Sequence, residues 1–335
     1  MKEYGYLDLH VAGEPFRLLT DGVPEIRGKT MAERRLYAIT HLDALRKLAL
    51  LEPRGHDDMY GGFLTPPVNP GSDFGVVFIH GTGMSTMCGH GIIALSRAAV
   101  ELKIVNVQEG VNEIAIDAPS GTVKTQVDVK NGRVNAIHFC NDLSFSYGIN
   151  QKIKTPSYGD VKVDIGYGGA FMVFADVNQF KRKLCRENIP DLIDIAMECG
   201  RNAIEQLNMV HPERPDLNAK DNGICMILLD MEEIDDRMIR TKTFTVFGEG
   251  QFDRSPTGTG TSALAAVLQQ KGILTEEKTL ENRGISDVPF RVTIKIVDDK
   301  VIPTIHSNAY ITGKGVILVE KEDPLQNGFT IKAGK

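Results

Sequence analysis

Hydrophobic residues at helical spacing mark the first element that the chain predicts. Residues 30–51 open with the letters Thr-Met-Ala-Glu, a pattern typical of a capped helix start. Leucine and isoleucine then recur every three or four residues, as on one side of an amphipathic helix. The segment therefore predicts a single helix, and the residues of its expected core face are Leu36, Ile39, Leu42 and Leu45.

A buried strand, a polar loop and a second helix follow one another further along the first half. The continuous apolar run at 74–80 predicts the strand, and residues 81–87 predict the loop. Residues 91–102 carry their apolar side chains on one helical stripe, which predicts the helix. Cys88 is therefore expected where the loop becomes a helix.

The second half of the chain repeats this order of elements. Alternation over 161–175 predicts strands, and residues 190–209 predict an amphipathic helix with proline in its first turn. A strand at 241–247 then leads through a loop to Thr257 and to a helix at 261–270. Tight hairpins are predicted at Asn131-Gly132 and at Asp298-Asp299.

An internal repeat relates the two halves. Residues 87–95, Met-Cys-Gly-His-Gly-Ile-Ile-Ala-Leu, match residues 256–264, Pro-Thr-Gly-Thr-Gly-Thr-Ser-Ala-Leu, with Gly, Gly, Ala and Leu at identical spacing. The offset, 257 − 88 = 169, is close to half of the 335 residues. We expect a duplicated chain that folds as two similar domains facing each other. The predicted bounds are 1–150 for the first domain, 151–324 for the second, and a tail from about 325 to 335 that completes the first.

Each copy of the repeat predicts a site for an anion. A helix start exposes unpaired backbone N–H groups and the positive end of the helix dipole, and glycine lets an anion come close. Two such starts facing each other would clamp a carboxylate. A dinucleotide-binding fingerprint is the alternative, but its first glycine directly follows a strand, whereas a seven-residue loop precedes Cys88. Glycines that merely allow close helix packing are a further alternative.

Cys88 is the candidate for the chemistry. A thiol at a helix N-terminus has a lowered pKa, so it can act as a base or as a nucleophile. Because His90 lies two residues on, a cysteine hydrolase stays open. Proton transfer at a substrate carbon that lies between the two loop–helix junctions explains the repeat better. His90 and Asp253 would then bind the ammonium and the carboxylate of the substrate. Buried and inert thiols are expected at Cys140, Cys185, Cys199 and Cys225.

Composition excludes several other classes. The net charge is -6, from 44 acidic and 38 basic residues without a long block of one sign, so nucleic acid and anionic membranes are poor partners. We find no apolar run of the roughly 20 residues that a membrane span needs, and expect a soluble, cytoplasmic protein with reduced thiols. Since the histidines show no HExxH or close Cys/His pattern, neither a metal nor an organic cofactor is predicted.

Longer motifs along nearly the whole chain resemble the proline racemase family. The matching segments are His10–Pro15, Glu52–Tyr60, Met87–Gly91, Tyr167–Gly169, Gly248–Pro256 and Ala309–Gly313. The resemblance implies an α+β fold of the diaminopimelate epimerase type. In that fold two similar domains are related by pseudo-two-fold symmetry, and each is a curved, mostly antiparallel sheet around a central helix.

The resemblance also implies a reaction. In the racemases and hydroxyproline epimerases of the family, two cysteines flank the α-carbon of the substrate, and one removes a proton while the other donates one. Cys88 matches the first, but Thr257 stands in place of the second, and an alcohol is too weak an acid for that exchange. The chain is similar to Cys/Thr members that are trans-3-hydroxy-L-proline dehydratases. Hydroxyproline 2-epimerase, proline racemase and a non-catalytic amino-acid binder remain alternatives.

Further site residues follow from the same resemblance. The backbone at Gly89, His90, Gly258 and Thr259 would hold the carboxylate of a hydroxyproline-like substrate. His90 and Asp253 would lie near its ring nitrogen, and Thr257 would position the substrate or a water molecule. A homodimer is the expected assembly.

Overall fold

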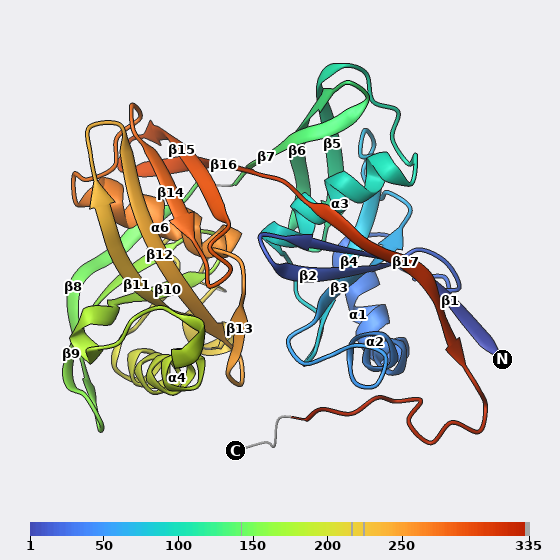
Figure 1. Cartoon of the computed structure of the whole chain (residues 1–335), viewed down its shortest axis with the longest axis horizontal. Helices are drawn as coiled ribbons and strands as arrows, with labels where there is room; N and C mark the ends of the chain where they lie inside the picture. The colour runs from blue at the N-terminus through green and yellow to red at the C-terminus, as the bar shows by residue number, and fades with distance from the viewer. Residues whose placement is uncertain (142, 216, 224, 332–335) are drawn as a thin grey trace. The chain divides into compact units, whose positions relative to one another are not determined.

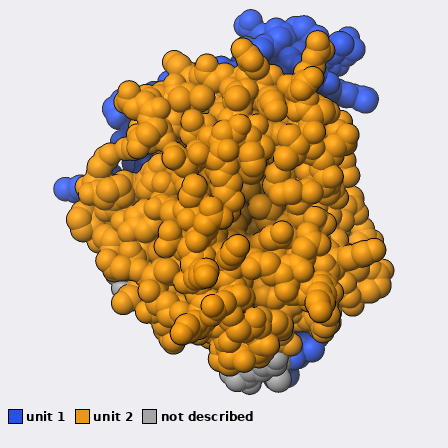
Figure 2. Space-filling model, turned by 90° about the vertical axis from the view of Figure 1, so that its left-hand side faces the viewer, with its two compact units in different colours: residues 1–139, 307–335 blue, residues 140–306 orange. Residues whose placement is uncertain are grey.

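A computed structural model describes residues 1–141, 143–215, 217–223 and 225–331 of the chain. The chain forms two compact units, which Figure 2 colours separately. Unit 1 comprises Met1–Phe139 and Ser307–Lys335, and unit 2 comprises Cys140–His306. The domain bounds expected near residues 150 and 324 stay predictions, whereas the compact units meet at 139/140 and at 306/307.

Unit 1 is a sheet with a helix pair and a central helix (Figure 1). Its strands are β1 Lys2–Val11, β2 Glu14–Leu19, β3 Tyr60–Thr65, β4 Phe74–His80, β5 Gly110–Ala118, β6 Gly121–Lys130, β7 Arg133–Cys140 and β17 Tyr310–Val319. Its helices are α1 Met31–His41, α2 Asp43–Leu50 and α3 Gly89–Glu101. The strand order is β17-β1-β2-β3-β4-β5-β6-β7, parallel at β2–β3 and β4–β5 and antiparallel elsewhere.

Unit 2 has corresponding elements, but its first strand along the chain matches β17, the last strand of unit 1. Its strands are β8 Phe145–Thr155, β9 Gly159–Tyr167, β10 Phe171–Asp176, β11 Cys225–Ile234, β12 Met238–Phe247, β13 Gln251–Asp253, β14 Thr279–Arg283, β15 Pro289–Val297 and β16 Lys300–Ser307. Its helices are η1 Val177–Phe180, η2 Arg186–Asn188, α4 Ile189–Gln206, α5 Ala219–Asn222 and α6 Gly258–Gln270. The order is β8-β9-β10-β11-β12-β14-β15-β16, parallel at β10–β11 and β12–β14; the short β13 pairs with β12.

The two units, taken singly, share one topology. From β17 to β7 and from β8 to β16, the strand directions read antiparallel, antiparallel, parallel, antiparallel, parallel, antiparallel, antiparallel. Helix α3 joins the parallel pair β4–β5, and α6 joins the parallel pair β12–β14, because parallel neighbours need a crossover connection. The prediction of two similar α+β units with mostly antiparallel sheets is confirmed.

Each unit buries its central helix in its own sheet. Helix α3 packs against β1, β2, β3, β6 and β17, and α6 packs against β8, β9, β10 and β15. Both helices are buried along most of their length, as their runs of alanine and leucine predict. The other face of the sheet is covered by α1 and α2 in unit 1 and by α4 in unit 2. Packing against the strands therefore fixes the position of each central helix within its unit.

The single helix predicted over residues 30–51 is wrong. Helix α1 ends at His41, α2 begins at Asp43, and Leu42 between them leaves the helical conformation with φ -120°. The predicted core face is confirmed for Leu42 and Leu45, which are buried, but is wrong for Leu36 and Ile39, which are 60% and 42% exposed. On α1 it is Met31 and Ala38 that are buried.

Most other elements agree with prediction. The strand at 74–80, the strands within 161–175, the helix over 190–209 and the strand at 241–247 are confirmed to within a few residues. Both central helices begin two or three residues earlier than predicted, at Gly89 and Gly258. The turn at Asn131-Gly132 has φ of 53° and 69°, as a type I′ hairpin requires. The C-terminal segment joins unit 1 through β17, which pairs with β1, and through Phe329, which exchanges backbone hydrogen bonds with Glu52.

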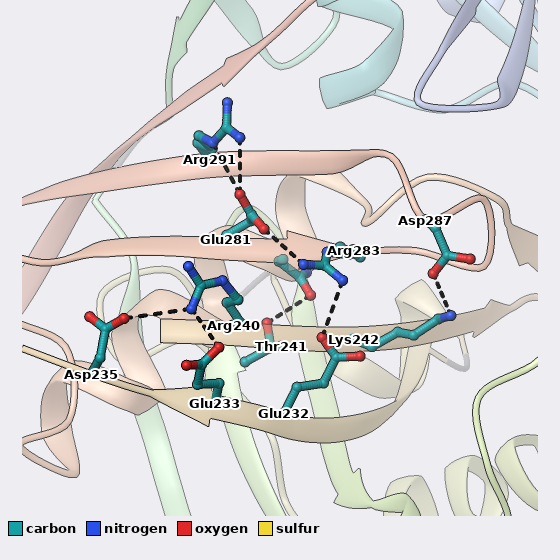
Figure 3. Close-up of polar contacts among 11 residues, drawn as sticks. Glu232, Glu233, Asp235, Arg240, Thr241, Lys242, Glu281, Arg283, Asp287 and Arg291 are labelled. Carbon is teal, nitrogen blue, oxygen red and sulfur yellow. Dashed lines mark hydrogen bonds and ion pairs between the residues drawn. The ribbon is translucent and has the colours of Figure 1, made fainter. Parts of the chain in front are cut away.

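Ion pairs connect neighbouring strands on one face of unit 2 (Figure 3). Glu281 on β14 accepts hydrogen bonds from Arg283 and Arg291, at 3.0 and 3.1 Å. Burial alone would raise the pKa of Glu281, but these two guanidinium groups lower it. Lys242 on β12 reaches Asp287 at 2.5 Å. Glu281–Arg291 joins β14 to β15, whereas Arg283 lies on β14 itself and Asp287 in the turn that follows it. Such partly exposed pairs each stabilise the fold little.

Candidate active site

Cys88 is the N-cap residue of α3. Its backbone is extended, with φ -152° and ψ 108°, and its Sγ accepts a hydrogen bond from the backbone N–H of Gly91 at 3.2 Å. The side chain thus takes the place that a serine or aspartate oxygen usually has at a helix start. A thiolate at this position would gain both that hydrogen bond and the positive end of the helix dipole.

His90 lies against the thiol. Its Nδ1 is 3.3 Å and its Nε2 3.6 Å from the Sγ of Cys88, and both residues are 6% exposed. The ring is fixed edge-on by Phe16 at 6.1 Å and by Tyr60 at 5.0 Å between centroids. Tyr60 also forms a hydrogen bond with the hydroxyl of Ser85. Cys88, Gly89 and His90 therefore form one packed group at the start of α3.

Gly91 is required by close packing. A Cβ atom at this position would lie 2.8 Å from the ring carbons of Phe16 and of Phe78, and 3.0 Å from the Sγ of Cys88. Both rings are fully buried. The second glycine of the first Gly-x-Gly thus keeps space for the thiol as well as for the helix.

Thr257 is the N-cap residue of α6, but its geometry differs from that of Cys88. Its φ is 62°, which is rare for a β-branched residue. The hydroxyl makes no helix-capping hydrogen bond; it donates to Oδ2 of Asp253 at 2.8 Å. The other oxygen of Asp253 accepts from the N–H of Ser255 at 2.8 Å, and the N–H of Thr257 donates to Oγ of Ser255 at 3.1 Å. Asp253, Ser255 and Thr257 therefore form a single hydrogen-bonded group.

A buried amide supports this second junction. Asn282 on β14 is fully buried; its Oδ1 accepts hydrogen bonds from the hydroxyls of Thr241 and Thr243, at 2.9 and 3.2 Å. Its Nδ2 donates to Oγ1 of Thr261 at 2.9 Å, and Thr261 donates to the carbonyl of Pro256 at 2.9 Å. This network ties β12 and β14 to the residue before Thr257. Sequence reasoning missed Asn282, because its partners lie 21 to 41 residues away.

The predicted site residues thus form two groups, one in each unit. Cys88, Gly89 and His90 lie at the start of α3. Asp253 and Thr257 are in direct contact, and Gly258 and Thr259 are the first residues of α6. In both units, the residues of the repeat occupy the same topological position. Their roles toward a substrate stay predictions.

The other cysteines are free thiols in different surroundings. Cys199 is buried, and burial raises its pKa to about 12. The pKa of Cys225 is raised to about 12 by burial and, secondarily, by Asp253. The expectation of burial is confirmed for Cys199 and wrong for Cys140, which is exposed at the end of β7, whereas Cys185 and Cys225 are half-buried.

Among residues 1–141, 143–215, 217–223 and 225–331, no three His, Cys, Asp or Glu side chains gather closely enough to hold a metal ion. Within the same ranges, the helices are too short or too polar to cross a membrane.

The fold and its relatives among known proteins identify the family of the chain. The fold and the paired helix starts are those of a two-unit α+β protein that presents one loop–helix junction in each unit. A family model described as proline racemase matches residues 6–330, and the chain belongs to the proline racemase family.

Individual relatives carry different activities in their names. The chain is 38% identical over 338 residues to a trans-3-hydroxy-L-proline dehydratase of Bacillus cereus, covering 98% of each chain. It is 36% identical over 335 residues to the proline racemase of Clostridioides difficile, covering 97% of each. A crystal structure of a hydroxyproline epimerase from Agrobacterium vitis, with bound trans-4-hydroxy-L-proline, is similar with a TM-score of 0.86 and 26% identity, covering 100% of this chain and 96% of that one.

Proposed function

We propose that the protein is a hydro-lyase that converts trans-3-hydroxy-L-proline into pyrroline-2-carboxylate without a cofactor. In this proposal Cys88 removes the α-proton, and no second thiol acts from the other side. One observation carries the proposal. Thr257 occupies the position that matches Cys88, and its hydroxyl donates a hydrogen bond to Oδ2 of Asp253 at 2.8 Å. A hydroxyl that is bound in this way cannot readily deliver a proton to a carbanion.

The remaining site residues would bind the substrate. The backbone N–H groups at Gly89, His90, Gly258 and Thr259 begin two helices, and such groups suit a carboxylate. The carboxylate of Asp253 suits the ring ammonium of the substrate, and the ring of His90 would lie beside it. Thr257 would position the substrate, because its lone pairs can still accept a hydrogen bond while its proton is held by Asp253.

The proposed reaction uses one thiol twice. The thiolate of Cys88 takes the α-proton, and the resulting electron pair forms the C2–C3 double bond as the C3–O bond breaks. The 3-hydroxyl is trans to the carboxylate and so lies on the same ring face as the α-hydrogen. The thiol can therefore give the proton that it took to the departing hydroxyl, which leaves as water. The enamine product then tautomerises to the cyclic imine.

Product trapping tests this proposal. Purified protein is incubated with trans-3-hydroxy-L-proline, and the imine is captured with o-aminobenzaldehyde. L-proline and trans-4-hydroxy-L-proline are followed in parallel by polarimetry. We expect imine from the 3-hydroxy substrate, unchanged optical rotation with the other two, and loss of imine formation in Cys88→Ser. Near-normal dehydration by Cys88→Ser would contradict the single-thiol mechanism.

An epimerase or racemase is the second candidate. It is favoured by the similarity to the hydroxyproline epimerase from Agrobacterium vitis and to the proline racemase of Clostridioides difficile. It would require Thr257 and Asp253 together to act as an unusual second acid. A change of optical rotation without imine formation would support it, and binding without any turnover would indicate a non-catalytic binder. A homodimer remains the expected assembly, which light scattering of the purified protein tests.

A further inference from the structure

The loop that precedes Cys88 is held by two arginines from the helix pair of unit 1. This loop, residues 81–87, connects β4 to the start of α3. Arg35 lies on α1 and Arg46 lies on α2. Both donate hydrogen bonds to backbone carbonyl oxygens at the loop, and neither contact is visible as a sequence motif.

Arg46 holds the beginning of the loop. Its Nη1 donates to the carbonyl oxygens of His80 and Gly81, at 2.7 and 2.6 Å. Its Nε and Nη2 both lie 2.7 Å from Oδ1 of Asp43, one helical turn earlier. The residue is 3% exposed. A buried guanidinium is costly unless its donors are satisfied, so Asp43 and the two carbonyl groups constrain one another through Arg46.

Arg35 holds the middle of the loop. Its Nε and Nη2 both donate to the carbonyl oxygen of Met84, at 2.9 and 2.6 Å. The carbonyl of Thr86 is held separately by the N–H of Ser120 at 3.1 Å. The C=O and N–H of a trans peptide point in opposite directions, so these contacts also set the direction of the amides that follow. The path into Cys88 is thus constrained at four carbonyl groups between residues 80 and 86.

We propose that Arg35 and Arg46 are positioning residues for Cys88. They fix the loop 81–87 from the side of α1 and α2, so that the thiol meets the N–H of Gly91 and the ring of His90 in one arrangement. The inference rests on the proposed function of Cys88 as the base. In this role the arginines act through the backbone of the loop and take no part in proton transfer.

Lysine variants and a matched control test this inference. Arg35→Lys and Arg46→Lys keep the positive charge but lose the paired donors. Arg34→Lys is the control, since Arg34 is the neighbouring residue on α1 and also donates to backbone carbonyls, those of Gly28 and Pro66, which lie outside the loop. For each variant, kcat and KM are measured with trans-3-hydroxy-L-proline, together with the thermal midpoint.

A second readout does not depend on the substrate. The rate of Cys88 alkylation by iodoacetamide is measured across pH by peptide mass spectrometry, with the exposed Cys140 as an internal reference. In Arg35→Lys and Arg46→Lys we expect kcat to fall about tenfold or more, with KM within about twofold, because a small misplacement of a reacting group is costly. The pH profile of Cys88 alkylation should shift, whereas that of Cys140 should not. Arg34→Lys should change neither kcat nor the profile.

The outcomes separate this inference from the proposed function. Unchanged kcat and an unchanged Cys88 profile in both loop variants would overturn it, as would an equal loss of kcat in Arg34→Lys. If Arg46→Lys does not fold, the half-buried Arg35 decides the question through its own variant. If the wild type makes no imine, the proposed function fails, and the alkylation profiles still show whether the arginines position Cys88.

Discussion

Replacement of Gly91 by alanine puts one methyl group into the most crowded part of the first junction. The new Cβ would lie 2.8 Å from Cε2 of Phe16 and from Cε1 of Phe78, and 3.0 Å from the Sγ of Cys88. Ordinary carbon–carbon contacts are about 3.5–4.0 Å, so each neighbour would have to move by roughly 0.5 Å or more. Both rings are fully buried, which leaves the thiol as the group that is freest to move.

The expected loss of stability follows from two opposing effects. Overpacking of a filled core costs about 1–3 kcal/mol. Alanine within a helix gains up to about 1 kcal/mol over glycine. We therefore expect Gly91→Ala to lower the free energy of unfolding by about 1–2 kcal/mol and the thermal midpoint by about 2–8 °C. Displacement of the thiol should lower kcat by about tenfold to hundredfold.

Urea unfolding and imine trapping measure the two effects, and Gly260→Ala is the matched comparison. In α6, the corresponding Cβ would lie 2.8 Å from Cδ1 of Ile227, the end of a flexible side chain, and 3.2 Å from Cβ of Thr257. This variant should lose less stability than Gly91→Ala, because Ile227 can turn aside. If Gly91→Ala is as stable and as active as the wild type, the argument from crowding at Cys88 is wrong.

Thr257, His80 and Asn282 each allow a further prediction. Thr257→Val keeps the shape of the side chain, so imine formation should persist at a reduced rate, and complete loss would mean that the hydroxyl takes part in the chemistry. The pKa of His80 is lowered from 6.5 to about 4 by burial, Arg46 and Arg35. The unfolded chain therefore binds this proton first, and the free energy of unfolding should fall between pH 6.5 and 4 by at most about 3 kcal/mol, a slope that His80→Gln should flatten in urea titrations. Asn282→Ala should cost about 1–3 kcal/mol for each buried hydroxyl that it leaves without a partner, measured as a lower urea midpoint.

Local patterns in the sequence predicted the parts of the site that are local in structure. The Gly-x-Gly repeat, the polar loop before Cys88 and the apolar stripe after it are contiguous, so they identify both helix starts. The break between α1 and α2 at Leu42 carries no glycine or proline, and continuous helical spacing therefore concealed it. The spacing of Leu36 and Ile39 likewise predicts amphipathicity but not which side meets the sheet.

The residues that hold the two helix starts in place could not be predicted, because their hydrogen-bond partners are distant along the chain. Arg46 contacts residues 34 and 35 positions away, and Asn282 contacts Thr241 at a separation of 41. In the sequence, a buried arginine and a buried asparagine resemble any surface polar residue. Only the strand order, which brings β12 beside β14, shows why Asn282 meets the threonines.

The duplicated topology shows which features distinguish the junction at Cys88 from the one at Thr257. Equivalent strands and helices carry the two junctions to the same topological place, so their difference lies in the cap residue and its backbone. Cys88 is extended, and its sulfur faces the N–H of Gly91. Thr257 has a positive φ, and its oxygen faces the carboxylate of Asp253. A nearby helix amide stabilises an anion, whereas a nearby carboxylate destabilises one. The surroundings therefore favour a thiolate base at Cys88 and a neutral hydroxyl at Thr257, as the chemistry of the two side chains also does.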